Sequence, residues 1–408
     1  MMKKRLFLLL AFICFFVAAS AGDTTKIKRL TFISFQPAEG LVMPTPYING
    51  NTKAPNVVSL NLKYGFHAKG DKWEDHYFGM PYKGIGIYKP FYSMNKELGN
   101  PFGVYLFQGA KIKEFKSGVS LNYEINLGLS FNWNHYNIIN NPDFKVFGSG
   151  LNALLGGSLY FKKPISNRFD FLWGIDFLHF SNGAWRTPNN GLNSLSANVG
   201  VAYNITNDSR AQNVKDKGYT LSRYDDLEFV PPGFEKQTLH DISFFVTKRT
   251  LNVDTVGTNM KIKNRYIDRS FIVAGLNYAF MWHNIRRFMW GPSVEMLYDE
   301  GLGVEVYGDV SKETDVYYER VELGKISDRF IVGLSLRGEL VMPGYSIFGN
   351  LGYNVLSSSG KERRFYQTYG VKIYLTDGLS SSFGVKSYEF TKSKYLFLSV
   401  GYTFRKAK

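Results

Sequence analysis

Side chains alternate between apolar and polar over a stretch much longer than an ordinary strand needs. From 119 to 133 every odd position carries an apolar or aromatic side chain, and every even position carries Ser, Asn, Glu or Gly. Because successive side chains of a strand point to opposite faces, the stretch has one apolar and one polar face. Strands of soluble proteins mostly have about five or six residues, whereas a membrane-crossing strand needs about 9 to 11 in the apolar band alone. The pattern therefore predicts a tilted strand of a transmembrane β-barrel.

The same repeat recurs along the chain, for example over 195–205, 330–340 and 396–404. In lipid every backbone polar group must be paired, which strands achieve only in a closed barrel. The sequence thus predicts an all-β, antiparallel barrel of the outer-membrane type with about sixteen strands, and twelve or fourteen are the alternatives. The predicted strands lie near 29–37, 55–66, 81–91, 101–112, 118–133, 149–161, 167–181, 193–205, 239–248, 269–282, 286–298, 328–341, 344–356, 364–376, 379–389 and 394–405.

Composition excludes several other classes of protein. Hydrophobic residues make up 44% of the chain and aromatic residues 16%, which is too much apolar surface for a disordered protein. The single cysteine, Cys14, excludes a disulfide scaffold. No run of 18 apolar residues follows position 21, so a helical membrane protein is disfavoured. There is no Cys/His zinc spacing and no nucleic-acid-binding module, so neither a metal site nor a nucleic-acid partner is expected.

The amino terminus indicates the compartment. Lys3 to Arg5 form a basic stretch, an apolar stretch covers 6–17, and small residues up to Ala21 precede Gly22. This is typical of a secretory signal peptide, with an uncleaved anchor helix as the alternative. A secreted, basic barrel is expected in the bacterial outer membrane, inserted by the barrel-assembly machinery and facing anionic lipid or polysaccharide.

The simplest domain organisation has one barrel after the signal peptide of residues 1–21. In this interpretation 22–408 form a single outer-membrane barrel domain. Its part 22–205 holds the candidate active site, and 206–238 is an irregular linker or plug. Residues 239–408 supply the remaining strands.

The candidate chemistry lies at the end of the seventh predicted strand. Phe177, His179 and Ser181 share its apolar, outward face. A serine with a neighbouring imidazole is the minimum apparatus of a serine esterase, and its outward position implies a membrane lipid as substrate. The alternative is that His179 and Ser181 are polar residues tolerated where a strand leaves the bilayer.

The surrounding sequence resembles a known family over about 167–205. His179-Phe180-Ser181-Asn182-Gly183 is followed by Pro188-Asn189-Asn190-Gly191. This resembles the His-x-Ser-Asn and Pro-Asn-x-Gly elements of the PagL-type lipid A 3-O-deacylases, also called acyloxyacyl hydrolases. The resemblance implies an outer-membrane hydrolase that removes an ester-linked acyl chain from lipid A of lipopolysaccharide. The small enzymes of this family are eight-stranded barrels, so the additional strands of this chain are a departure.

A second departure concerns the third member of the triad. The family has a glutamate where this chain has Asn193, fourteen residues after His179. An asparagine carbonyl accepts a hydrogen bond from imidazole and fixes its tautomer, but it stabilises the imidazolium less than a carboxylate does. The Ser, His and Asn set also resembles outer-membrane phospholipase A, which uses calcium and dimerises. That enzyme's aromatic-Asn-Arg setting is absent here, since Leu192 and Ser194 flank Asn193. No cofactor is expected for the deacylase, and calcium only for the phospholipase.

Further roles follow from the resemblance. Ser181 would be the nucleophile, His179 the general base and then acid, and Asn193 the residue that orients the imidazole. Asn189, the backbone N–H groups of Asn182 and Gly183 after the serine, and the side chain of Asn182 would bind the oxyanion, with turn formation as the alternative role of the asparagines. Phe177 and Arg186 would contact the lipid, and an ordinary lipid-facing ring and a solvated cation are the alternatives. A non-enzymatic pore or structural barrel is the remaining alternative, because the inner faces are polar.

Overall fold

The structure is a computed structural model. It describes residues 30–44, 54–69, 73–137, 139–205, 233–254, 265–310, 317–357, 364–390 and 392–405. The predicted signal peptide and residues 206–232 of the predicted linker lie outside the described residues.

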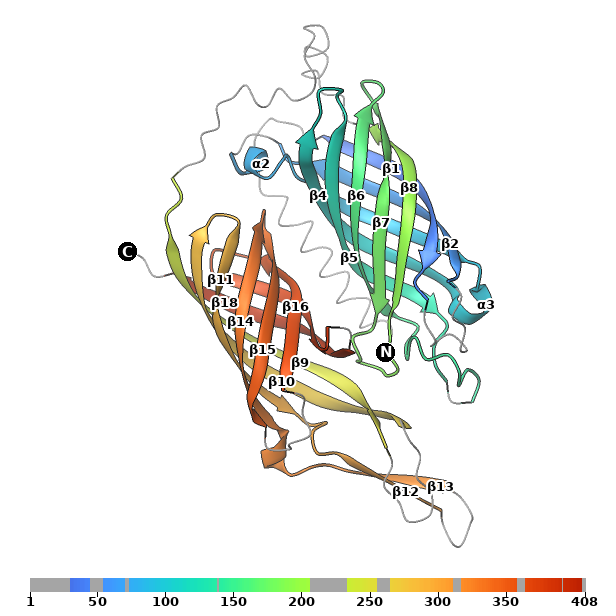
Figure 1. Ribbon diagram of the computed structural model, residues 1–408, viewed down its shortest axis with the longest axis vertical. Coiled ribbons are helices and arrows are strands. Elements are labelled where there is room, and N and C mark those ends of the chain that lie inside the picture. Colours follow the sequence, from blue (N-terminus) through green and yellow to red (C-terminus); the bar gives the residue numbers. More distant parts are fainter. Residues whose placement is uncertain are drawn as a thin grey trace.

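The first eight strands form a closed antiparallel barrel (Figure 1). Each strand pairs with the next one along the chain, and the eighth returns to pair with the first, for example at Ser34 and Ala202. The strands are β1 (Thr31–Val42), β2 (Asn56–His67), β3 (Tyr82–Tyr92), β4 (Gly99–Glu114), β5 (Ser120–Trp133), β6 (Asn152–Pro164), β7 (Phe169–Ser181) and β8 (Leu192–Asn204).

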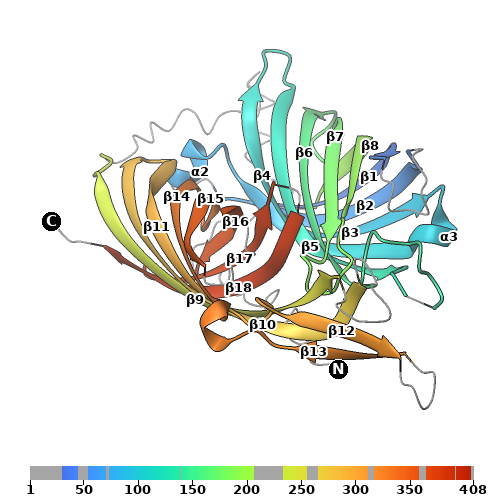
Figure 2. The same cartoon turned by 60° about the horizontal axis from the view of Figure 1, so that its bottom comes forward.

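Eight later strands form a second closed barrel, in which β18 pairs with β9. Figure 2 shows the two barrels as separate cylinders. The strands of the second barrel are β9 (Gln237–Val253), β10 (Arg265–Ile285), β11 (Phe288–Asp299), β14 (Phe330–Met342), β15 (Tyr345–Ser357), β16 (Phe365–Tyr374), β17 (Leu379–Tyr388) and β18 (Lys392–Arg405).

The predicted all-β antiparallel architecture with about sixteen barrel strands is confirmed, but the prediction of a single barrel over 22–408 is wrong. Alternation reveals which face of a strand is apolar, and it does not specify the partner of an edge strand. One sixteen-stranded barrel and two eight-stranded barrels therefore produce the same sequence pattern. The pairing of β8 with β1 and of β18 with β9 distinguishes them.

The connections contain the other regular elements. The connection between β11 and β14 holds a two-stranded sheet of β12 (Glu305–Val310) and β13 (Tyr317–Glu322). A 3₁₀ helix, η2 (Ile326–Arg329), follows it. The first barrel has two short helices, α2 (Trp73–Tyr77) and α3 (Asn95–Leu98). No helix in the described part of the chain is long and apolar enough to cross a membrane.

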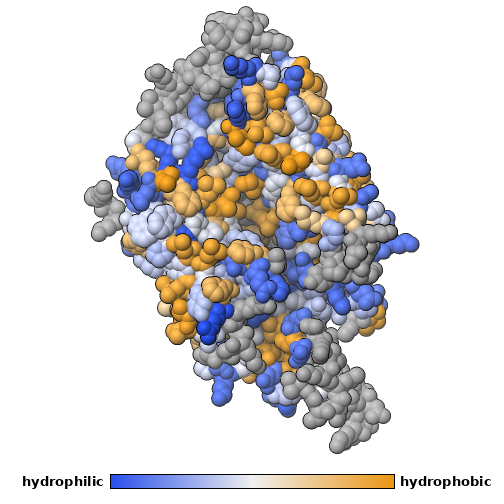
Figure 3. All heavy atoms as spheres, in the orientation of Figure 1, coloured by the Kyte–Doolittle hydropathy of each residue, from blue (hydrophilic) through white to orange (hydrophobic). Residues whose placement is uncertain are grey.

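The outward faces of both barrels are apolar. Phe35 and Leu62 are exposed on the first barrel, and Phe244, Leu336 and Val400 are exposed on the second. Figure 3 shows apolar residues over much of the visible face of both barrels. Exposed apolar surface of this extent is typical of strands that face lipid.

The barrel interiors are occupied by paired side chains. In the first barrel, Lys63 Nζ lies 2.6 Å from Glu124 Oε1 in a fully buried ion pair. In the second, Asp299 pairs with both Arg249 and Lys394, each at 3.0 Å. An eight-stranded barrel has an interior just wide enough for side chains to fill. This packing argues against an open pore through either barrel.

The barrels lie side by side with corresponding ends together. At one end, the amide of Thr187 after β7 donates to Thr250 Oγ1 of β9 over 2.7 Å. At the other, Arg287 after β10 donates to the carbonyl of Tyr77 in α2. We call the end with the β7–β8 connection, residues 182–191, the loop end. The opposite end, which carries the β4–β5 turn, is the turn end.

Candidate active site

His179 and Asn193 lie directly opposite each other on the paired strands β7 and β8. His179 Nδ1 is 2.7 Å from Asn193 Oδ1. Because an amide oxygen can only accept, Nδ1 carries the proton and donates it to this bond. The other ring nitrogen, Nε2, is then the acceptor, as a general base requires.

Ser181 follows two residues later on the same face of β7, at the loop end. The residue is only 7% exposed. The connection that follows is held at the rim of the barrel, where Asn189 bridges Phe147 and accepts from the amide of Asn182. Within the described residues no hydrogen bond joins Ser181 to His179. In unliganded enzymes such bonds are often long and shorten when substrate binds.

Two glycines allow the loop to pack this closely. Gly191 has φ +72°, and a Cβ placed there would lie 2.9 Å from Cε1 of His179. Gly183 has φ +59°, and its Cβ would lie 1.9 Å from Cγ of Leu396 in the second barrel. A side chain at either position would displace the imidazole or separate the loop from the neighbouring barrel.

Asn189 links the loop to both barrels. Its Oδ1 accepts a hydrogen bond from the amide of Asn182 at 2.8 Å, and its Nδ2 donates to Ser393 Oγ of β18 at 2.7 Å. The backbone amide of Asn182, one of the predicted oxyanion donors, is thus already engaged. The amide group of Asn189 has two N–H donors, of which Ser393 takes one.

The side chain of Asn182, one residue after Ser181, is buried with its polar atoms unpaired. It is 1% exposed, and neither Nδ2 nor Oδ1 has a hydrogen-bond partner. An unsatisfied buried polar group costs about 1–3 kcal/mol. Such a group one residue after Ser181 is well suited to bind a ligand that supplies the missing partner.

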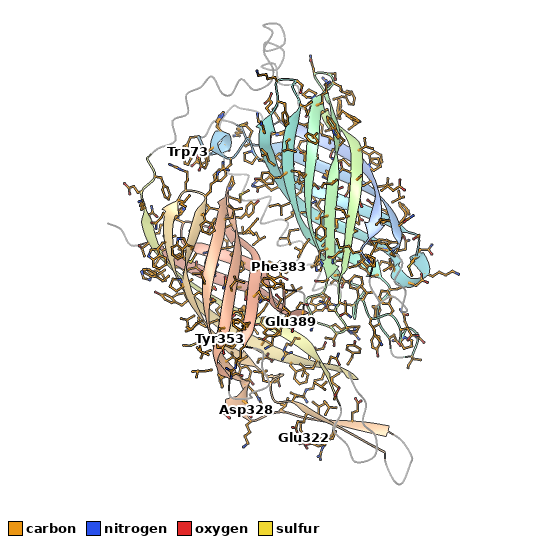
Figure 4. All side chains as sticks on the ribbon, viewed as in Figure 1. Trp73, Glu322, Asp328, Tyr353, Phe383 and Glu389 are labelled. Carbon is orange, nitrogen blue, oxygen red and sulfur yellow. The ribbon has the colours of Figure 1, made fainter. Side chains whose placement is uncertain are left out.

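The second barrel holds the loop through further contacts. Thr250 Oγ1 of β9 lies 2.9 Å from Thr187 Oγ1, and its amide donates to the carbonyl of Ala184 at 3.3 Å. Leu396 of β18 packs against Gly183. In Figure 4 the label Glu389 marks the turn before β18, next to the loop end of the first barrel. Sequence reasoning missed these residues, because no local pattern connects positions so distant in the chain.

The loop also rests on the interior of its own barrel. Phe180 points inward from β7, with its ring centroid 5.0 Å from that of Trp133 and 5.9 Å from that of Tyr88. Phe147 forms an antiparallel bridge with Asn189. These buried aromatic residues fix the backbone on either side of His179 and Ser181, and alternation alone did not distinguish them from other inward residues.

The remaining predicted site residues lie at the periphery. Phe177 is 42% exposed on the outward face of β7, just inside His179. Arg186 is exposed on the loop. Asn190 donates to the carbonyl of Lys145 at 2.7 Å, as a turn former does. No group of three or more His, Cys, Asp or Glu side chains that could hold a metal ion occurs within the described ranges.

One protein family matches part of the chain. Residues 241–406 match the family described as the C-terminal domain of acyloxyacyl hydrolases. The match covers the second barrel and does not include His179, Ser181 or Asn193. No curated protein matches the chain.

Several solved outer-membrane structures align with the chain at low similarity. An outer membrane channel from Pseudomonas putida F1 has 8% identity and a TM-score of 0.20, over 94% of this chain and 98% of the channel. A variant of the ferric enterobactin receptor from Pseudomonas aeruginosa has 8% identity and a TM-score of 0.26, over 91% of this chain and 80% of the receptor. A variant of the Rh. blastica porin has 9% identity and a TM-score of 0.19, over 92% of this chain and 100% of the porin. Scores this low carry no argument about function.

Proposed function

We propose that this chain, of which residues 241–406 match the family of acyloxyacyl hydrolase C-terminal domains, is an outer-membrane serine esterase. Its reaction is the removal of an ester-linked acyl chain from a lipid of the outer leaflet, with lipid A of lipopolysaccharide as the substrate. The family match supports hydrolysis of lipid acyl esters in general. The substrate and the residues are our proposal.

The observation that carries the proposal is the hydrogen bond between His179 Nδ1 and Asn193 Oδ1. It selects the imidazole tautomer that a general base needs, at a position where the nucleophile Ser181 follows on the same face. A polar pair tolerated at a membrane boundary has no need of a defined tautomer.

The reaction begins with attack of Ser181 Oγ on the ester carbonyl, while His179 Nε2 takes the hydroxyl proton. The negative charge that develops on the carbonyl oxygen is stabilised by the side-chain amides of Asn182 and Asn189 and by the amide of Gly183. The tetrahedral intermediate collapses when the ester C–O bond breaks, and His179 returns the proton to the departing alcohol. Water then cleaves the acyl-enzyme by the same steps, which releases the fatty acid.

Asn193 orients His179 throughout but carries no charge. It fixes the neutral tautomer, and it stabilises the imidazolium through one hydrogen bond only. We therefore expect a slower reaction than a glutamate at this position would permit.

The exposed apolar faces support an outer-membrane location, with the loop end in the outer leaflet. Phe177, on the outward face below His179, would contact the acyl chain, and the exposed Arg186 would meet the phosphate groups of lipid A. Outer-membrane phospholipase activity is the second candidate, because Asn193 has the amide chemistry of that enzyme's triad.

The test is acyl release by the refolded chain from lipid A and, separately, from a diacyl phospholipid, each with and without calcium. Mass spectrometry follows the products. Ser181→Ala should abolish release, and the matched control Ser327→Ala, an exposed serine of η2, should leave it unchanged. Serine-dependent release from lipid A supports the deacylase, and calcium-dependent release from the phospholipid alone supports the second candidate. Release that survives Ser181→Ala, or no release from either lipid, contradicts the proposal.

A further inference from the structure

A pocket of about 660 Å³ lies at the turn end, where the two barrels meet. This volume is within the range of about 300–1,000 Å³ that is usual for ligand sites. The label Trp73 in Figure 4 marks the α2 helix, whose end contributes to the wall. Its lining comes from both barrels, with α2 and the β4–β5 turn on the first and Arg287 and Met342 on the second.

The charged part of the lining is predominantly basic. Lys111, Lys113, Lys116 and Arg287 face a single acid, Glu114. Lys111 Nζ pairs with that carboxylate at 2.8 Å. An excess of cationic side chains therefore remains in the pocket, which favours an anionic ligand.

Arg287 is held in place for such a ligand. Its guanidinium stacks 4.5 Å above the ring of Tyr77 and 5.3 Å above that of Phe78. The guanidinium donates to the carbonyl of Tyr77, which is its one hydrogen bond in the described part of the chain. A guanidinium has five N–H donors in a planar fork that matches phosphate oxygens, so most of its donors can still bind a phosphate group.

The other part of the lining is apolar and continuous with the lipid-facing surface. Ile112 is 54% exposed and Phe115 is 38% exposed. Met342, from the second barrel, also lines the pocket. A ligand that uses both parts has an anionic head and apolar tails.

We propose that this pocket binds one anionic phospholipid, such as phosphatidylglycerol. Its phosphate lies against Arg287, Lys113 and Lys116, and its acyl chains run along Ile112 and Phe115. Basic pockets between membrane segments bind anionic head groups in this way. Because the pocket lies at the end opposite Ser181, this lipid belongs to the other leaflet and is distinct from any substrate. It would join the two barrels, since each contributes part of the wall. The proposal does not depend on the esterase activity.

The experiment is native mass spectrometry of the purified full chain in detergent micelles, titrated with phosphatidylglycerol or with the zwitterionic phosphatidylcholine. We expect phosphatidylglycerol to be retained at least tenfold more tightly, and the double variant Lys113→Gln/Arg287→Gln to lose this preference. The matched control is Lys392→Gln, an exposed lysine at the loop end, which should bind like the unaltered chain. Inorganic phosphate in millimolar excess should not displace the lipid.

Equal retention of the two lipids would overturn the proposal, and so would an unchanged preference in the double variant. Full displacement by inorganic phosphate would show a phosphate site with no use for the acyl chains, which also overturns it. If the double variant fails to fold, Lys113→Gln and Lys116→Gln are tested singly. Each removes one exposed cation at the turn end and should weaken phosphatidylglycerol binding severalfold.

Discussion

The hydrogen bond between Asn189 and Ser393 is the sharpest test of whether the second barrel contributes to the proposed chemistry. Ser393→Ala removes the oxygen that accepts from Asn189 Nδ2 at 2.7 Å, and it leaves His179, Ser181 and Asn193 untouched. Asn189 keeps its bond to the amide of Asn182. The Thr187–Thr250 contact still anchors the loop. We therefore expect the loop to stay in place while the Asn189 amide loses its fixed orientation.

The expected magnitude follows from that single bond. A neutral hydrogen bond contributes about 0.5–1.5 kcal/mol, which corresponds to a rate change of about 2- to 13-fold. Loss of orientation of an oxyanion donor acts on the transition state, so kcat should fall while KM stays nearly constant. The largest possible effect is that of Asn189→Ala, which removes the donor itself. This variant should lose about 2.7–4 kcal/mol of transition-state stabilisation.

Two assays measure this effect. The first is acyl release from lipid A, and the second is the rate at which a fluorophosphonate labels Ser181, which needs the same oxyanion donors but no lipid. Ser393→Thr keeps the hydroxyl and should restore the rate, and Ser327→Ala should have no effect. In the Ser393→Ala/Asn189→Ala double variant, the loss should equal that of Asn189→Ala alone. Additive losses, or a normal rate in Ser393→Ala beside a slow Asn189→Ala, would refute the reasoning. Absence of both acyl release and labelling in the unaltered chain would instead refute the esterase.

Three further predictions concern other contacts. Asn193→Ala should lower kcat by about 10- to 160-fold, because a hydrogen bond to the charged imidazolium is worth about 1.5–3 kcal/mol. A kcat equal to that of the unaltered chain would exclude a role for Asn193. Gly191→Ala should inactivate a barrel that still folds, because its Cβ would meet His179 at 2.9 Å in a left-handed backbone conformation. Circular dichroism checks the fold, and full activity would argue against the close packing of the loop. Asp299→Ala should destabilise the second barrel by about 3–5 kcal/mol, because it leaves Arg249 and Lys394 buried without their counter-charge. The readout is the denaturant midpoint, compared with Asp328→Ala in the exposed η2 helix as the control.

Strand positions were predictable because each strand has one face toward lipid and one toward the interior, and the side-chain period of two reveals this directly. All sixteen predicted segments overlap barrel strands. The closure of the strands into two separate barrels was not predictable. A pairing such as Ser34 with Ala202 depends on sheet curvature and strand tilt, which the alternation does not encode. The β12–β13 hairpin was missed because its strands have only six residues each and are interrupted by charged side chains.

The pairing of His179 with Asn193 was predictable for a local reason. The two residues flank one connection between adjacent strands, so their shared parity and similar height follow from the sequence. The engagement of Asn189 and the close packing at Gly183 were not predictable, because they depend on contacts with Ser393 and Leu396, about two hundred residues away.

The two barrels use the corresponding rim in different ways. In the first barrel, the seventh strand ends with His179 and Ser181, which have the chemistry of a base and a nucleophile. In the second barrel the seventh strand is β17, which contains no histidine, and its Lys386 points inward to pair with Glu295. The rim beyond it carries Ser393 and Leu396, and these contact the loop of the first barrel. The barrel that lies within the family match thus has no histidine and serine pair at this position, and it provides the surface against which the other barrel's loop is held. A second barrel in this chain is therefore explained by the loop it supports, and its removal should impair the site even though His179, Ser181 and Asn193 all lie in the first.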